Sequence, residues 1–102
     1  MFISGQIGRE PDTEKMAEGG IGGQTKQALH NIIRLVESQG LTSRNIVKTT
    51  VFILNIEDFG AMNIAYREFF NGDSLPARST VAVSALPSPE AYVEIEAIAF
   101  GE

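Results

Sequence analysis

The sequence predicts a single α+β domain over residues 1–102, with strands and helices in the order β-α-β-α-β-β. Two segments repeat apolar residues at helical spacing, and the segment between them is rich in β-branched residues. Two apolar stretches that read as strands follow the second helical segment. Two helices cover only one face of such a mixed sheet. The other face therefore needs a partner, which a symmetric oligomer would supply.

The composition is that of a globular protein, with 43% hydrophobic and 21% charged residues. The net charge of −5 and the scattered basic residues argue against nucleic acid as a partner. The chain has no cysteine and one histidine, which excludes disulfides, thiolate nucleophiles and His-rich metal sites. No apolar run approaches the ~20 residues of a membrane span, and no signal peptide is recognisable. We therefore expect a cytoplasmic protein.

The first predicted strand covers residues 2–7, and a polar, glycine-rich loop follows over residues 8–23. Ser4, Gly5 and Gln6 combine a hydroxyl, a bare backbone and an amide at the end of this strand. Glycine at this place either lets a ligand approach the main chain or marks a β-bulge. The tripeptide alone leaves both readings open.

Residues 24–39 form the first predicted helix, and Gly40 is suited to end it. His30 lies on the polar face of this helix, at four-residue spacing from Lys26 and Arg34. Its side chain is either a general base or a solvated helix residue. The polar surroundings favour the solvated residue.

Residues 46–54 are apolar on much of both faces, which predicts a central strand. Asn55 is a candidate N-cap for the second helix, which Gly72 would end. The helix carries an apolar stripe that we assign to core packing rather than to a cofactor site. Its members are Phe59, Met62, Tyr66, Phe69 and Phe70.

The last two strands are predicted over residues 78–85 and 92–100. In the final strand Glu94 and Glu96 share a face with large apolar residues, with Cα atoms about 6.6 Å apart. One interpretation is a solvated face or an interface ion pair. The other is a carboxylate at the edge of a desolvated pocket, where it could move a proton or orient water.

Arg78 follows Pro76 closely, and the proline restricts the backbone from which the guanidinium emerges. A fixed guanidinium suits bidentate capture of a carboxylate, although a surface ion pair would explain it equally well. If the last two strands form a hairpin, Glu94 lies opposite Val83 and roughly 17 Å from Arg78. A site that uses both residues would then have to cross a subunit boundary.

Four segments together resemble the RidA family, the reactive-intermediate deaminases also labelled L-PSP endoribonuclease-like. The segments are Phe2-Ile3-Ser4-Gly5-Gln6-Ile7, Val47-Lys48-Thr49-Thr50-Val51-Phe52, Pro76-Ala77-Arg78-Ser79 and Val93-Glu94-Ile95-Glu96-Ala97. The resemblance runs from Phe2 to Phe100. It implies a chorismate-mutase-like fold, a homotrimer with a central β-barrel, and clefts between subunits that bind small carboxylates.

The resemblance also implies roles for individual residues. Arg78 matches the arginine that grips the substrate carboxylate, and Glu94 matches the glutamate that positions or activates the hydrolytic water. The matching cleft-lining residues are Ser4, Gly5, Asn63 and Thr80.

The chain departs from the family pattern in four places. About twenty further residues usually precede Phe2, where they form another strand and supply a tyrosine. Thr80 stands where cysteine is frequent, and Ala85 replaces a common arginine. The segment 86–92 contains one extra residue and a second proline. These differences imply an open sheet edge and a wider cleft.

The activity implied by the resemblance is hydrolysis of 2-imino or enamine acids to 2-keto acids and ammonia. The substrates would be 2-aminoacrylate, 2-iminobutanoate and 2-iminopropanoate. Such chemistry needs no metal or organic cofactor, only binding, a held water and one proton transfer. The alternatives are a non-enzymatic trimer that binds 2-keto acids and, with less support from the acidic composition, an endoribonuclease.

We predict that His30→Ala leaves turnover within about twofold and stability within about 0.5 kcal/mol of the wild type, because surface substitutions have small effects. Ammonia release and thermal unfolding measure the two quantities. A tenfold loss of turnover in a folded variant would show that His30 belongs to the chemistry.

Overall fold

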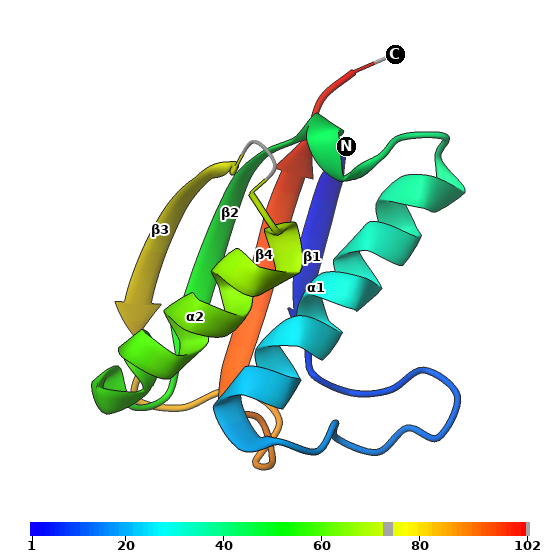
Figure 1. The fold of residues 1–102 in the computed structure, drawn as a ribbon. Coiled ribbons are helices and arrows are strands. Elements are labelled where there is room, and N and C mark those ends of the chain that lie inside the picture. The colour runs from blue at the N-terminus through cyan, green and yellow to red at the C-terminus, as the bar shows by residue number, and fades with distance from the viewer. Residues whose placement is uncertain (73–74, 102) are drawn as a thin grey trace.

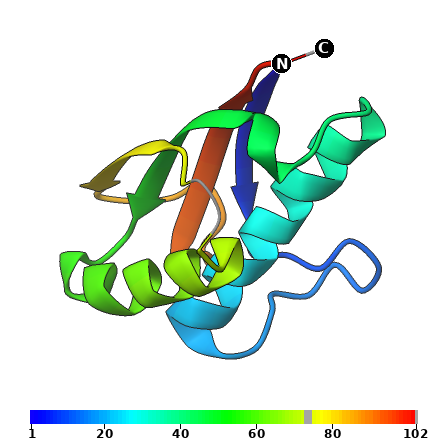
Figure 2. The same ribbon diagram turned by 45° about the horizontal axis from the view of Figure 1, so that its top comes forward.

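The computed structural model describes residues 1–72 and 75–101 and has the predicted order of elements (Figure 1). One mixed sheet and two α-helices make up the domain, and both helices lie on the same side of the sheet (Figures 1 and 2). Short 3₁₀ turns at Ser43–Asn45 and Ile56–Asp58 precede the second strand and the second helix. The elements are β1 (Phe2–Ile7), α1 (Gly20–Ser38), β2 (Ile46–Ile53), α2 (Phe59–Phe70), β3 (Ala77–Ala82) and β4 (Val93–Ala99).

The strand order is β1-β4-β2-β3, so the predicted hairpin between the last two strands is wrong. Helix α2 carries the chain from the end of β2 back to its beginning, which makes β3 parallel to β2. The chain then crosses to the far side of β2, and β4 pairs antiparallel with both β1 and β2. Glu94 consequently lies opposite Phe52 on β2, not opposite Val83.

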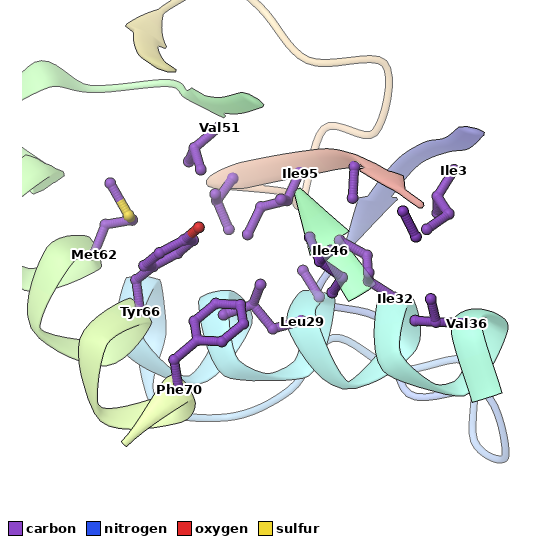
Figure 3. Packing of buried hydrophobic residues seen from close by; sticks show 14 of the residues in the cluster. Ile3, Leu29, Ile32, Val36, Ile46, Val51, Met62, Tyr66, Phe70 and Ile95 are labelled. Atoms are coloured by element: carbon purple, nitrogen blue, oxygen red, sulfur yellow. The ribbon is translucent and has the colours of Figure 1, made fainter. Parts of the chain in front are cut away.

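The hydrophobic core lies between the sheet and the two helices (Figure 3). Val93, Ile95, Ala97 and Ala99 on β4 are all at most 3% exposed, as their alternation predicts. The stripes of α1 and α2 pack against them as expected, with one exception. Phe59 is 40% exposed and lies outside the core.

Three boundaries differ from the prediction by more than one residue. Helix α1 begins at Gly20 rather than residue 24, because its first turn is built from glycines that read as loop. The side chain of Asn55 makes no capping bond, and the turn Ile56–Asp58 leads into α2 instead. Strand β3 ends at Ala82 rather than residue 85, close to where its partner β2 ends at Ile53.

His30 is exposed on α1, as its spacing predicts. Its ring meets the ring of Phe69 edge-on, with centroids 5.1 Å apart, which the sequence did not indicate. Neither helix in the described part of the chain combines the length and the apolar character of a membrane span.

The face of the sheet that points away from the helices carries apolar side chains at its ends and polar ones between them. Phe2 and Ile98 are paired across β1 and β4 and are 85% and 36% exposed. Val81, on β3, is 45% exposed beside Phe52. Lys48 lies between these groups and donates hydrogen bonds to Thr50 Oγ1 and Ser79 Oγ. We call this surface the bare face.

Candidate active site

Arg78 lies on the helix side of the sheet, at the edge strand β3. It is paired with Thr49 on β2, whose hydroxyl lies 2.8 Å from the hydroxyl of Tyr66 on α2. The guanidinium carbon of Arg78 lies 4.6 Å from the centre of the Tyr66 ring and 5.8 Å from that of Phe59. Two residues of the aromatic stripe of α2 therefore contact Arg78 as well as packing in the domain. The sequence interpretation assigned the stripe to core packing alone and missed this contact.

A cavity of about 440 Å³ opens beside this guanidinium. It brings together the predicted residues Arg78 and Asn63 and adds Arg67, one helical turn after Asn63. No acidic residue lines it among the described residues, so the two guanidinium groups make it suited to an anion. The lining residues are Asn63, Tyr66, Arg67, Leu75, Pro76 and Arg78.

Burial raises the pKa of Tyr66 above its ordinary value of 10.0, although the Thr49 hydrogen bond and the Arg78 charge act in the opposite direction. The phenol is therefore neutral at physiological pH. It offers Arg78 a ring face but no competing negative charge.

Thr80 follows Arg78 by two residues and shares its side of the sheet, because its β2 neighbour Val51 is a core residue. Its hydroxyl oxygen is buried and finds no hydrogen-bond partner in the described part of the chain. Thr80 does not line the cavity itself. It nevertheless supplies an unused hydroxyl close to Arg78.

Ser4, Gly5 and Glu94 form a second group, on β1 and β4. The β1–β4 register shifts between Ile3 and Gln6, so the strand pairing is irregular at Ser4 and Gly5, as the bulge interpretation expects. A Cβ atom at Gly5 would lie 2.7 Å from Cδ of Glu94 and would overlap its carboxylate. Glycine at this position therefore makes room for the glutamate side chain.

The two groups do not meet within one chain. Arg78 points to the helix side with Thr49, whereas Glu94 shares the bare face with Phe52. Strand β2 lies between them, and the register offset of three residues puts their Cα atoms roughly 14 Å apart. The separation inferred from the sequence thus holds, although the hairpin used to infer it does not exist.

A larger cavity, of about 590 Å³, lies between the free edge of β1, the loop after it and α1. Its two arginines, Arg9 and Arg34, are accompanied by Glu10 and Glu14. Arg9 already donates to the backbone oxygen of Glu14 at 2.7 Å. This cavity is therefore less suited to an anion than the cavity beside Arg78.

Comparison with known proteins defines the class of protein. The model of the family described as "Endoribonuclease L-PSP" matches residues 1–100. The rat protein named 2-iminobutanoate/2-iminopropanoate deaminase is 42% identical over 99 residues, which are 97% of this chain and 71% of the rat protein. The chain therefore belongs to the Rid family, the L-PSP family of the matching model.

Solved structures agree with this assignment. A Rid family protein of Yersinia pestis shares 49% identity at a TM-score of 0.88, over 96% of this chain and 77% of the other. Escherichia coli TdcF, solved with bound serine, shares 37% identity at a TM-score of 0.92, over 99% of this chain and 80% of TdcF. The α+β fold with two helices on a four-stranded mixed sheet is common to them.

We predict that Gly5→Ala displaces the Glu94 carboxylate without unfolding the domain, because the overlap is with the end of a flexible side chain. The ¹³C chemical shift of the Glu94 carboxyl should change while the thermal midpoint moves little. Gly60→Ala is the control, since beyond its own helix backbone and chain neighbours no atom of the described residues lies within 4 Å of its Cβ position. An unchanged Glu94 signal in Gly5→Ala would contradict the close packing.

Proposed function

We propose that the protein hydrolyses reactive 2-imino or enamine acids to 2-keto acids and ammonia. The reaction takes place in a cleft between two subunits of a homotrimer. One subunit contributes Arg78 with Asn63 and Thr80, and its neighbour contributes Glu94 with Ser4 and Gly5. The substrates in this proposal are 2-aminoacrylate, 2-iminobutanoate and 2-iminopropanoate.

The environment of Arg78 is the observation that carries this proposal. Its guanidinium lines a cavity that has no acidic residue among the described residues, and it contacts two aromatic rings. The described residues also give it no salt bridge or hydrogen bond. Its donors are therefore available to a planar carboxylate. Relatives named 2-iminobutanoate/2-iminopropanoate deaminase, from rat and mouse, support imino acids as the carriers of that carboxylate.

The proposed hydrolysis requires carboxylate binding, attack by one water molecule and proton transfer. Arg78 binds the carboxylate and so fixes the neighbouring C2 imine carbon. Glu94 accepts a proton from water as the oxygen attacks C2, and then returns a proton to the nitrogen. The resulting carbinolamine still carries a hydroxyl proton, which Glu94 transfers to the nitrogen as the C–N bond breaks. Ammonia leaves, and the C2 carbonyl of the 2-keto acid remains. No electron donor or acceptor is needed.

The bare face supports the trimer. Phe2, Val81 and Ile98 expose apolar surface there, and no described element covers them. Three sheets arranged around an axis, with their bare faces inward, would bury these side chains. In the proposed trimer, the Glu94 group of one chain lies beside the β3 edge of its neighbour.

A second candidate function is binding of small carboxylates without turnover. The structure of TdcF with bound serine favours this alternative, since serine carries a carboxylate and is not an imine. Both functions need Arg78, but only hydrolysis needs the carboxylate of Glu94. Glu94 therefore discriminates between them.

We predict a trimer of the 11.0 kDa chain in sedimentation equilibrium at micromolar concentration. Burial of the exposed apolar residues on the bare face would hold it together. A monodisperse monomer would contradict both the assembly and the shared site.

We predict that Arg78→Ala weakens 2-keto acid binding about ten- to hundredfold, through loss of a charge-assisted contact of roughly 1.5–3 kcal/mol. Arg78→Lys should restore only part of this affinity, because an ammonium lacks the planar two-pronged geometry.

Glu94→Gln should lower turnover while 2-keto acid binding persists. Ammonia release from enzymatically generated 2-iminobutanoate and calorimetric binding of 2-ketobutanoate measure the two effects.

Mixing the two variants tests whether the site is shared. Trimers that combine Arg78→Ala and Glu94→Gln subunits should regain activity, because some clefts then contain an intact Arg78 and an intact Glu94. Homotrimers of each variant are the controls, and mass spectrometry of differently labelled chains measures subunit exchange. Mixed trimers that stay inactive after complete exchange would rule out the shared site. Full activity of Glu94→Gln alone would rule out its role with water.

A further inference from the structure

Tyr66 belongs to the core and also touches the binding cavity. It is 2% exposed, and its ring packs against Phe70 at a centroid distance of 5.0 Å (Figure 3). Its hydroxyl meets the buried hydroxyl of Thr49 at 2.8 Å, so the side chain cannot move away from this position without breaking a buried polar pair. The ring is therefore held from both sides.

Arg78 contacts both Tyr66 and Thr49, which also contact each other. Thr49, which holds the Tyr66 hydroxyl, is also the residue directly paired with Arg78 across β2 and β3. The guanidinium in turn lies 4.6 Å from the centre of the Tyr66 ring. Backbone pairing, the hydroxyl pair and the cation–π contact thus link the same three residues.

We infer that Tyr66 is a positioning residue that holds the Arg78 guanidinium in place for the substrate carboxylate. The long side chain of Arg78 has no other fixed partner among the described residues except the ring of Phe59, which is itself 40% exposed. Without Tyr66 the guanidinium would have to be ordered when the ligand binds. This inference rests on the carboxylate role proposed for Arg78.

Phe70→Leu provides a matched control for Tyr66→Leu. Both residues are buried aromatics on α2, so both changes leave a cavity in the core and lower stability. Within the described residues, however, the rings that contact Arg78 are those of Tyr66 and Phe59. A purely structural role for Tyr66 would make the two variants behave alike.

The affinity for 2-ketobutanoate should fall about three- to tenfold in Tyr66→Leu, because ordering one freed side chain opposes binding by about that factor. Phe70→Leu should change it less than twofold. Tyr66→Phe keeps the ring and should also stay within about twofold, since Phe and Tyr both bind cations on their faces. In an Arg78→Ala background Tyr66→Leu should have no further effect, as expected of a residue that acts through Arg78.

A readout that does not depend on activity is the ¹⁵Nε–H signal of Arg78, assigned by its loss in Arg78→Lys. Its heteronuclear NOE should drop in unliganded Tyr66→Leu and remain high in Phe70→Leu and Tyr66→Phe. Tyr66→Met, which fills more of the space without a ring face, carries the test if Tyr66→Leu does not fold.

The outcomes separate this inference from the proposed function. An Arg78 signal that stays rigid in Tyr66→Leu, or that loosens equally in Phe70→Leu, overturns the positioning role. A signal that loosens in Tyr66→Leu alone, together with unchanged 2-ketobutanoate binding, supports positioning and overturns the carboxylate role of Arg78. A signal that loosens together with weaker binding supports both.

Discussion

Strand β4 sends alternate side chains to the two faces of the sheet, and the rest of the molecule depends on this separation. Val93 and Ile95 are fully buried beneath the helices, whereas Glu94 between them points to the bare face. Because β4 lies between β1 and β2, a slip of one residue would exchange the core for charged residues. Core packing therefore also fixes where the glutamate stands.

The same separation leaves each half of the site incomplete. Arg78 has an aromatic platform but no acidic partner among the described residues, and Glu94 is only half-buried over Gly5. Both charges stay in contact with water in the single chain, which avoids the cost of burying an unpaired charge. In the proposed trimer they would be desolvated together, with a bound carboxylate beside the guanidinium. Binding and assembly would then stabilise each other.

Features that depend on neighbouring residues in the sequence, such as which face of a strand a side chain occupies, were predictable from the sequence. The alternation of residues 92–100 placed Glu94 on the face opposite the core residues Val93 and Ile95, which the structure confirms. The pairing of the last strands was not predictable in this way, because consecutive strands usually pair and no turn residue encodes the insertion of β4 between β1 and β2. The contact between Arg78 and Tyr66 was missed for the same reason. It depends on the parallel β2–β3 register, which the α2 crossover sets.

The hydroxyl of Tyr66 shows why core and site cannot be assigned separately. Thr49 is fully buried at the centre of the sheet, and its hydroxyl would be costly there without a partner. The phenol satisfies it at 2.8 Å and thereby connects α2 to β2. A phenylalanine would fill the same space, but it would leave the Thr49 hydroxyl without a partner. Tyr66 therefore completes the core and also determines the position of the Arg78 guanidinium on β3.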